Sequence, residues 1–225
     1  MEEMKLSKKG NDLIKLYEEM VEKGIQKVDG TINNSAYNFF QLKKFRSMVK
    51  DKLSDEAIKT VLDYGSGGSD WDAPNFDSQT NQSAKDFFQI HNVDKFEPAR
   101  GLMEKKKADC VVCMDVLEHI FIEDIPKVVS ELFALSKKLL VVNVACYKAA
   151  ALLPNGENAH ITVRGADWWK GVFDVISSNY KNIEVFLICS NTFSSGIIFK
   201  SFKFGDWALT EGYTTNMSFQ TFQPS

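Results

Sequence analysis

The chain has 225 residues, 44% hydrophobic and 25% charged, a composition typical of a globular protein whose length fits one large α/β domain. A formal net charge of -3 and a pI of about 5.7 predict no global positive field, and therefore no nucleic-acid partner. No apolar stretch is long enough for a bilayer, the first residues lack the apolar core of a signal peptide, and four cysteines do not suggest a disulfide scaffold. We therefore expect a cytoplasmic protein that does not bind membranes.

Two amphipathic helices are predicted before the first strand. Apolar residues recur at helical spacing over residues 11–23 and again over 38–53. Between them, the turn-forming residues of segment 29–35 predict a loop. This N-terminal helical cap, residues 1–57, either covers a site or shields one side of the core.

From residue 60 onward, apolar runs alternate with helical segments. Strands are predicted at 61–64, 110–114, 139–144, 183–189 and 196–204, and helices at 124–136 and after an N-cap at Asp167. A turn at 191–195 predicts that the last two strands are antiparallel, whereas the tail 206–225 has no clear period. The alternation indicates a doubly wound, mostly parallel α/β sheet over residues 58–205, within a single domain spanning 1–225.

Cys110 and Cys113 form a C-x-x-C sequence inside a predicted buried strand. Side chains three residues apart on a strand point to opposite faces, so the two sulfurs cannot share one metal ion. Both are predicted to be core cysteines.

A glycine-rich turn follows the first strand of the alternating region. The chain reads Val-Leu-Asp-Tyr-Gly-Ser-Gly at 61–67, and glycines at such a turn let backbone N–H groups approach a ligand. An ordinary tight turn is the alternative. The string resembles motif I of the class I S-adenosylmethionine-dependent methyltransferases, although Ser69 stands where that family has a third glycine and Gly68 comes one residue early. The resemblance implies cofactor binding by Asp63, Gly65, Ser66 and Gly67.

Two acidic residues are candidates for the ribose contact at the end of the second strand, Asp94 and Glu97. A carboxylate there accepts hydrogen bonds from both ribose hydroxyls. Glu97-Pro98 is similar to the family's acidic-proline sequence, which favours Glu97. Glu97 lies 34 residues after Asp63, and the polar segment 71–82 is predicted to be an insertion that explains this length. Only 12 residues separate Glu97 from the next predicted strand, so the third strand unit is predicted to be stunted.

The sequence Asp-Val-Leu-Glu-His at 115–119 follows the strand predicted at 110–114. It resembles the family's strand-four motif, which leaves the sheet beside the cofactor. Open α/β sheets bind ligands at the carboxyl ends of their strands, so this motif and the glycine turn are predicted to meet in one crevice. The resemblance implies that Asp115 and Val116 contact the cofactor. His119 is a candidate general base, or alternatively a histidine that only packs.

A polar loop follows the strand predicted at 139–144. It reads Leu-Pro-Asn-Gly-Glu-Asn-Ala-His at 153–160, and a Trp-Trp pair follows at 168–169. It looks like a loop of a little-described group of bacterial and phage methyltransferases, a resemblance that covers roughly residues 58–175. Asn158, Arg164 and Trp168 are candidate substrate-binding residues and His160 is a second candidate base; the alternative is a loop held by its own hydrogen bonds. No metal site is predicted, because Glu157 and His160 lack an evident third ligand.

These motifs predict transfer of a methyl group from S-adenosylmethionine to an unidentified, small-molecule acceptor. One alternative is a non-catalytic domain that keeps the fold and binds a cofactor or partner. A second is an NAD-dependent oxidoreductase, with which the glycine turn alone is compatible.

Overall fold

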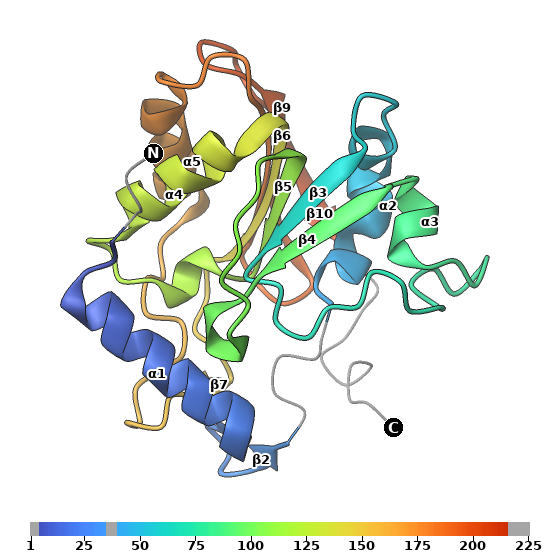
Figure 1. Ribbon diagram of the computed structural model, residues 1–225. Helices are drawn as coiled ribbons and strands as arrows, with labels where there is room; N and C mark the ends of the chain where they lie inside the picture. Colours follow the sequence, from blue (N-terminus) through green and yellow to red (C-terminus); the bar gives the residue numbers. More distant parts are fainter. Residues whose placement is uncertain (1–4, 35–39, 216–225) are drawn as a thin grey trace.

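The computed structural model describes residues 5–34 and 40–215. Its centre is a seven-stranded sheet of order β10-β9-β8-β6-β5-β3-β4 (Figure 1). The strands are β3 (Thr60–Tyr64), β4 (Asn92–Phe96), β5 (Ala108–Met114), β6 (Ser136–Ala145), β8 (Glu184–Ser190), β9 (Ser195–Phe202) and β10 (Leu209–Thr214). Five neighbouring strands, β4, β3, β5, β6 and β8, are parallel to one another. Strand β9 pairs antiparallel with both β8 and β10. The predicted mostly parallel α/β sheet and its antiparallel C-terminal pair are therefore confirmed.

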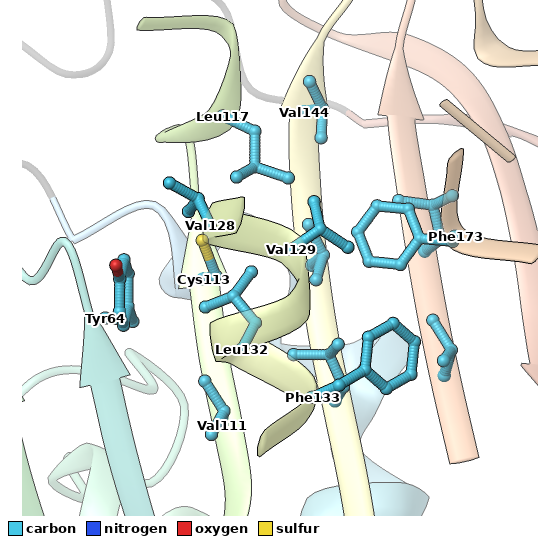
Figure 2. Close-up of a cluster of buried hydrophobic side chains, with 14 of the residues drawn as sticks. Tyr64, Val111, Cys113, Leu117, Val128, Val129, Leu132, Phe133, Val144 and Phe173 are labelled. Carbon is cyan, nitrogen blue, oxygen red and sulfur yellow. The ribbon is translucent and has the colours of Figure 1, made fainter. Parts of the chain in front are cut away.

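Helices cover both faces of this sheet (Figure 1). The helical elements are α1 (Lys8–Lys23), α2 (Leu42–Leu53), α3 (Ala84–Phe88), α4 (Ile125–Leu135), α5 (Ala166–Ser177) and the single 3₁₀ turns η1 (Pro98–Arg100) and η2 (Leu117–His119). One core lies under α4 and α5, and Figure 2 shows part of it; the other lies under α2 and α3. Because side chains alternate along β5, Cys113 belongs to the first core and Cys110 to the second, as predicted.

The first helix and a small second sheet lie at one edge of the central sheet. The small sheet contains β1 (Ile25–Lys27), β2 (Ile32–Asn33) and β7 (Ala151–Leu152), with β1 in the middle. A separate apolar cluster joins α1 to the segment around β7 through Leu13, Met20, Leu153 and Ala159. The N-cap of α1 is pinned to the main core, since Asp124 accepts hydrogen bonds from the Ser7 N–H (2.9 Å) and Oγ (2.6 Å).

Several sequence-based expectations need correction. The loop predicted at 29–35 contains strand β2 and the turn that joins it to β1, so residues 25–33 form a β-hairpin. Residue 35 and the first two residues of the helix predicted at 38–53 lie outside the described residues. The tail contains strand β10, which adds to the edge of the sheet; residues 216–225 are likewise outside the description. Gly165, not Asp167, is the N-cap residue of α5.

The connections around β4 also differ from a regular strand–helix unit. Helix α3 has only five residues, so segment 71–82 replaces most of a helix rather than adding to one. After β4, the chain forms η1 and returns to β5 with no further strand in this described stretch. The third strand unit is thus stunted, as predicted. Among the residues described, no helix has the length and apolar character needed to span a bilayer.

Candidate functional site

A pocket of about 570 Å³ lies where the carboxyl ends of β3, β4 and β5 meet. Its volume falls within the usual range for small-molecule sites. The sheet contributes the glycine turn after β3, the Glu97 region after β4 and the Asp115 region after β5, while α1 supplies Leu13, Ile14 and Tyr17 from the opposite side. Figure 1 shows α1 beyond this edge of the sheet. Of the two roles left open for the N-terminal helices, α1 covers the pocket and α2 packs on the core.

The glycine turn forms the floor of the pocket. Gly65 and Gly67 both have positive φ, 73° and 53°, which glycine adopts without steric cost. The N–H groups of Gly65 and Ser66 donate to the Phe96 carbonyl (2.7 and 3.1 Å), which joins the ends of β3 and β4. A Cβ on Gly65 would lie 2.4 Å from Val116 Cγ2. The motif at 61–67 and the motif at 115–119 are therefore in direct contact.

Asp63 is buried below the turn. Its Oδ2 accepts hydrogen bonds from Ser69 Oγ (2.6 Å) and Trp71 Nε1 (2.8 Å). Burial raises the pKa of Asp63, although these two bonds and Lys95 oppose the effect. Ser69 thus helps to hold the segment after the turn against the sheet, a role that a third glycine could not fill.

Glu97 lies directly after β4 and lines the pocket, whereas Asp94 lies within the strand and pairs with Lys106 at 3.3 Å, outside the pocket lining. One carboxylate oxygen of Glu97 accepts from the Gly67 N–H (2.8 Å) and the other from the Ala99 N–H (3.2 Å). Burial raises the pKa of Glu97. Of the two acidic candidates, only Glu97 lines the pocket.

Asp115 and Val116 form the wall between the glycine turn and η2. Asp115 has a positive φ of 62°, rare for a residue with a side chain, and its Oδ2 accepts from Gln41 Nε2 at 3.0 Å. Two buried polar atoms of the pocket lining, Gln41 Oε1 and Ser66 Oγ, have no hydrogen-bond partner among the residues that the structure describes. Buried polar groups are normally satisfied, so this wall has unused capacity to bind a polar ligand.

His119 faces the pocket from η2. Its Nδ1 lies 2.8 Å from Tyr17 Oη and 2.9 Å from the Ala159 carbonyl oxygen. Burial, followed by the neighbouring His160, lowers the pKa of His119 to about 4, against the opposing effect of Asp115. The imidazole is therefore neutral at pH 7, and such a low pKa makes it a weak general base.

Glu118 was not among the predicted site residues, although it stands inside the Asp-Val-Leu-Glu-His sequence. Its side chain is fully buried, and Oε1 accepts from the Ala145 N–H at 2.5 Å. Burial and then the Asp115 carboxylate raise the pKa of Glu118 well above its usual value. The position of this carboxylate, three residues after Asp115 and next to His119, was the signal that sequence reasoning could have used.

The predicted substrate-binding residues lie away from this pocket's lining. The Asn158 side chain bonds both the N–H (2.9 Å) and the carbonyl (2.8 Å) of Ala149, which matches the alternative of a loop held by its own hydrogen bonds. Arg164 is exposed and lies over the Trp168 ring, 5.9 Å from its centroid, and Trp168 packs against the core. His160 is buried beside His119, with ring centroids 4.8 Å apart.

No family model, curated protein or solved structure matches this chain. The pocket combines the glycine turn, a half-buried carboxylate at Glu97 and an apolar cover from α1, features that suit a ligand with both polar and apolar parts.

Proposed function

We propose that the protein transfers a methyl group from S-adenosylmethionine to a small-molecule acceptor. The observation that carries the proposal is that the glycine turn, Glu97 and the Asp115–Val116 pair all line one pocket. These segments resemble methyltransferase motifs. Gly65 and Val116 are 51 residues apart in the sequence, yet they pack directly against each other. Ser66 Oγ and Gln41 Oε1, which have no hydrogen-bond partner in the described part of the chain, support a ligand at this place.

When bound, S-adenosylmethionine supplies an electrophilic methyl group on a positively charged sulfonium. The residues of this chain would bind and orient it. Glu97 would accept hydrogen bonds from the ribose hydroxyls, and the backbone at 65–67 would lie against the methionine portion. α1, through Leu13 and Ile14, would exclude water from the reacting groups, which matters because methyl transfer depends on alignment and a dry site.

Proton removal from the acceptor is the step for which His119 is the candidate, since it lines the pocket. With a pKa of about 4, it suits an acceptor whose proton is already acidic, or one that carries no proton to remove. We therefore expect carboxylates and acidic hydroxyls to be better acceptors than simple alcohols.

Isothermal titration calorimetry of the purified protein with S-adenosylmethionine, S-adenosylhomocysteine and NAD tests the proposal. We expect micromolar binding of the first two, equivalent to about -8 kcal/mol, and none of NAD. Formation of S-adenosylhomocysteine in the presence of small carboxylates and phenols then tests turnover. Saturable binding of NAD alone would favour the oxidoreductase alternative, and cofactor binding with no turnover on any acceptor class would favour the non-catalytic domain.

A further inference from the structure

Four side chains that can ligate a metal gather at the back wall of the pocket: Asp115, Glu118, His119 and His160. One ligating atom from each lies within 4.8 Å of the other three. Asp115, Glu118 and His119 come from the turn after β5, and His160 comes from the loop after β7, 40 residues or more further along the chain. The fold therefore brings together a set that no local sequence motif contains.

Both imidazoles are held in the orientation that metal-binding histidines adopt. His119 Nδ1 lies 2.9 Å from the Ala159 carbonyl oxygen, and His160 Nδ1 lies 2.5 Å from the Tyr147 carbonyl oxygen. A carbonyl oxygen only accepts, so His160 Nδ1 carries the proton and its Nε2 holds a free lone pair. Nδ1 of His119 also lies 2.8 Å from Tyr17 Oη, and because that hydroxyl donates its proton to the Ala159 carbonyl (3.1 Å), Nδ1 of His119 is the donor as well. A backbone carbonyl on the second ring nitrogen is the usual support of a histidine that ligates a metal.

The carboxylates also retain unused ligand atoms. Glu118 has no exposed surface, and its Oε1 accepts from the Ala145 N–H. Its Oε2 receives no hydrogen bond from a nitrogen or hydroxyl donor of a described residue, and the carboxyl group is hydrogen-bonded only to that of Asp115, a contact that a cation can replace. Asp115 Oδ2 receives a hydrogen bond from Gln41. Burying two carboxyl groups and two imidazole lone pairs together is costly unless a positive charge lies between them.

We propose that Asp115, Glu118, His119 and His160 bind one divalent transition-metal ion, of which Zn²⁺ and Mn²⁺ fit best. Two nitrogens and two carboxylate oxygens suit these ions better than Mg²⁺ or Ca²⁺, which prefer oxygen ligands alone. With bonds of about 2.1 Å, ligand atoms lie roughly 3.4 Å apart around a tetrahedral ion and roughly 4.2 Å apart when they are opposite each other on an octahedral ion. A cluster whose ligand atoms lie within 4.8 Å of one another therefore has to contract by about 0.6 Å for octahedral Mn²⁺ and by about 1.4 Å for tetrahedral Zn²⁺. Asp115 and His119 also line the pocket, so the ion would lie at its wall. With the ion bound, His119 Nε2 is a ligand and no longer available as the base of the proposed methyl transfer.

Calorimetry of chelator-treated protein with ZnCl₂, MnCl₂ and MgCl₂ tests this inference, and thermal unfolding is recorded at each ratio. We expect one equivalent of Zn²⁺ or Mn²⁺ to bind and raise the Tm, with Mg²⁺ binding at least tenfold more weakly. Glu118→Gln and His160→Ala should each weaken binding by tenfold or more. The controls are His91→Ala, the only other histidine and an exposed one, and Glu157→Gln, an exposed neighbour of His160.

Equal weakening in the control variants would assign the binding to adventitious surface contacts and overturn the proposal. Absence of heat and of any Tm shift would also overturn it, in favour of a proton shared between Asp115 and Glu118. Asp115→Asn gives a third measurement if a Glu118 variant does not fold. Because no S-adenosyl compound is present in the titration, the outcome is independent of the proposed methyltransferase function.

Discussion

Replacing Lys44 by methionine is expected to stabilise the protein at pH 7. Lys44 lies on α2 with only 6% of its surface exposed and forms no ion pair with a described residue. Burial lowers the pKa of Lys44 from 10.5 to about 8, and Asp115 opposes this effect. Each pKa unit corresponds to ~1.4 kcal/mol, so the buried ammonium costs about 3 kcal/mol below pH 8.

Two aromatic rings offset part of this cost. Lys44 Nζ lies 4.8 Å from the ring centroid of Phe45 and 4.3 Å from that of Phe193. Such contacts contribute roughly 0.5–1 kcal/mol each, so Lys44→Met should raise the free energy of unfolding by about 2 kcal/mol at pH 7. The unfolded chain keeps the Lys44 proton between pH 8 and 10.5 whereas the folded chain loses it, so wild-type stability rises with pH in this window. By pH 9.5 the advantage of the variant should therefore fall by about 2 kcal/mol.

Urea unfolding at pH 7 and at pH 9.5 measures both values. Lys50→Met is the matched control, because Lys50 lies on the same helix over the Phe87 ring at 4.4 Å but is exposed. The control should show no such dependence on pH. A Lys44→Met variant that is less stable than wild type at pH 7, or whose advantage is the same at both pH values, would refute this account of the buried lysine.

Three further predictions concern the pocket and its supports. Glu97→Gln should weaken S-adenosylhomocysteine binding by about 1.5–3 kcal/mol while Asp94→Asn changes it little, and calorimetry giving the reverse ranking would reassign the ribose contact. Gly65→Ala should lower the free energy of unfolding, measured with urea, by about 2–4 kcal/mol, because the residue has a positive φ and its new Cβ would overlap Val116. Gly30 has a similar φ but open space around it, so Gly30→Ala should lower the free energy of unfolding by only about 1 kcal/mol in the same assay. Asn158→Ala should lower stability by about 1–3 kcal/mol with turnover following the folded fraction; loss of turnover in a fully folded variant would return Asn158 to the acceptor site.

The parts of the fold that sequence predicted best depend on regular apolar patterns. Strand β5 and the opposite facing of Cys110 and Cys113 follow from the period of a strand, and the antiparallel β8–β9 pair follows from a short turn. Strands β7 and β10 were missed because all their residues except Tyr213 are exposed or half-buried. Their pairing comes from the backbone of a neighbouring strand rather than from an apolar pattern.

The candidate site was predictable only where it is local in sequence. The glycine turn follows β3 and Asp115 follows β5, and the parallel pairing of these strands brings both to the same edge of the sheet. The joining of His160 to His119 could not be predicted, because it depends on how the loop after β7 packs under α1. Asn158 illustrates the same limit: its side chain type suits a substrate contact, and only its bonds to Ala149 show that it holds the loop.

The bond between Ser7 and Asp124 also bears on the order in which the molecule assembles. These residues are 117 positions apart in sequence, and their contact fixes the start of the helix that covers the pocket. Closing so long a loop is entropically costly, so α1 gains this anchor only after the chain around β5 and α4 has folded. During refolding, the glycine turn should therefore form before its cover, and ligand binding should appear after the central sheet has acquired its secondary structure.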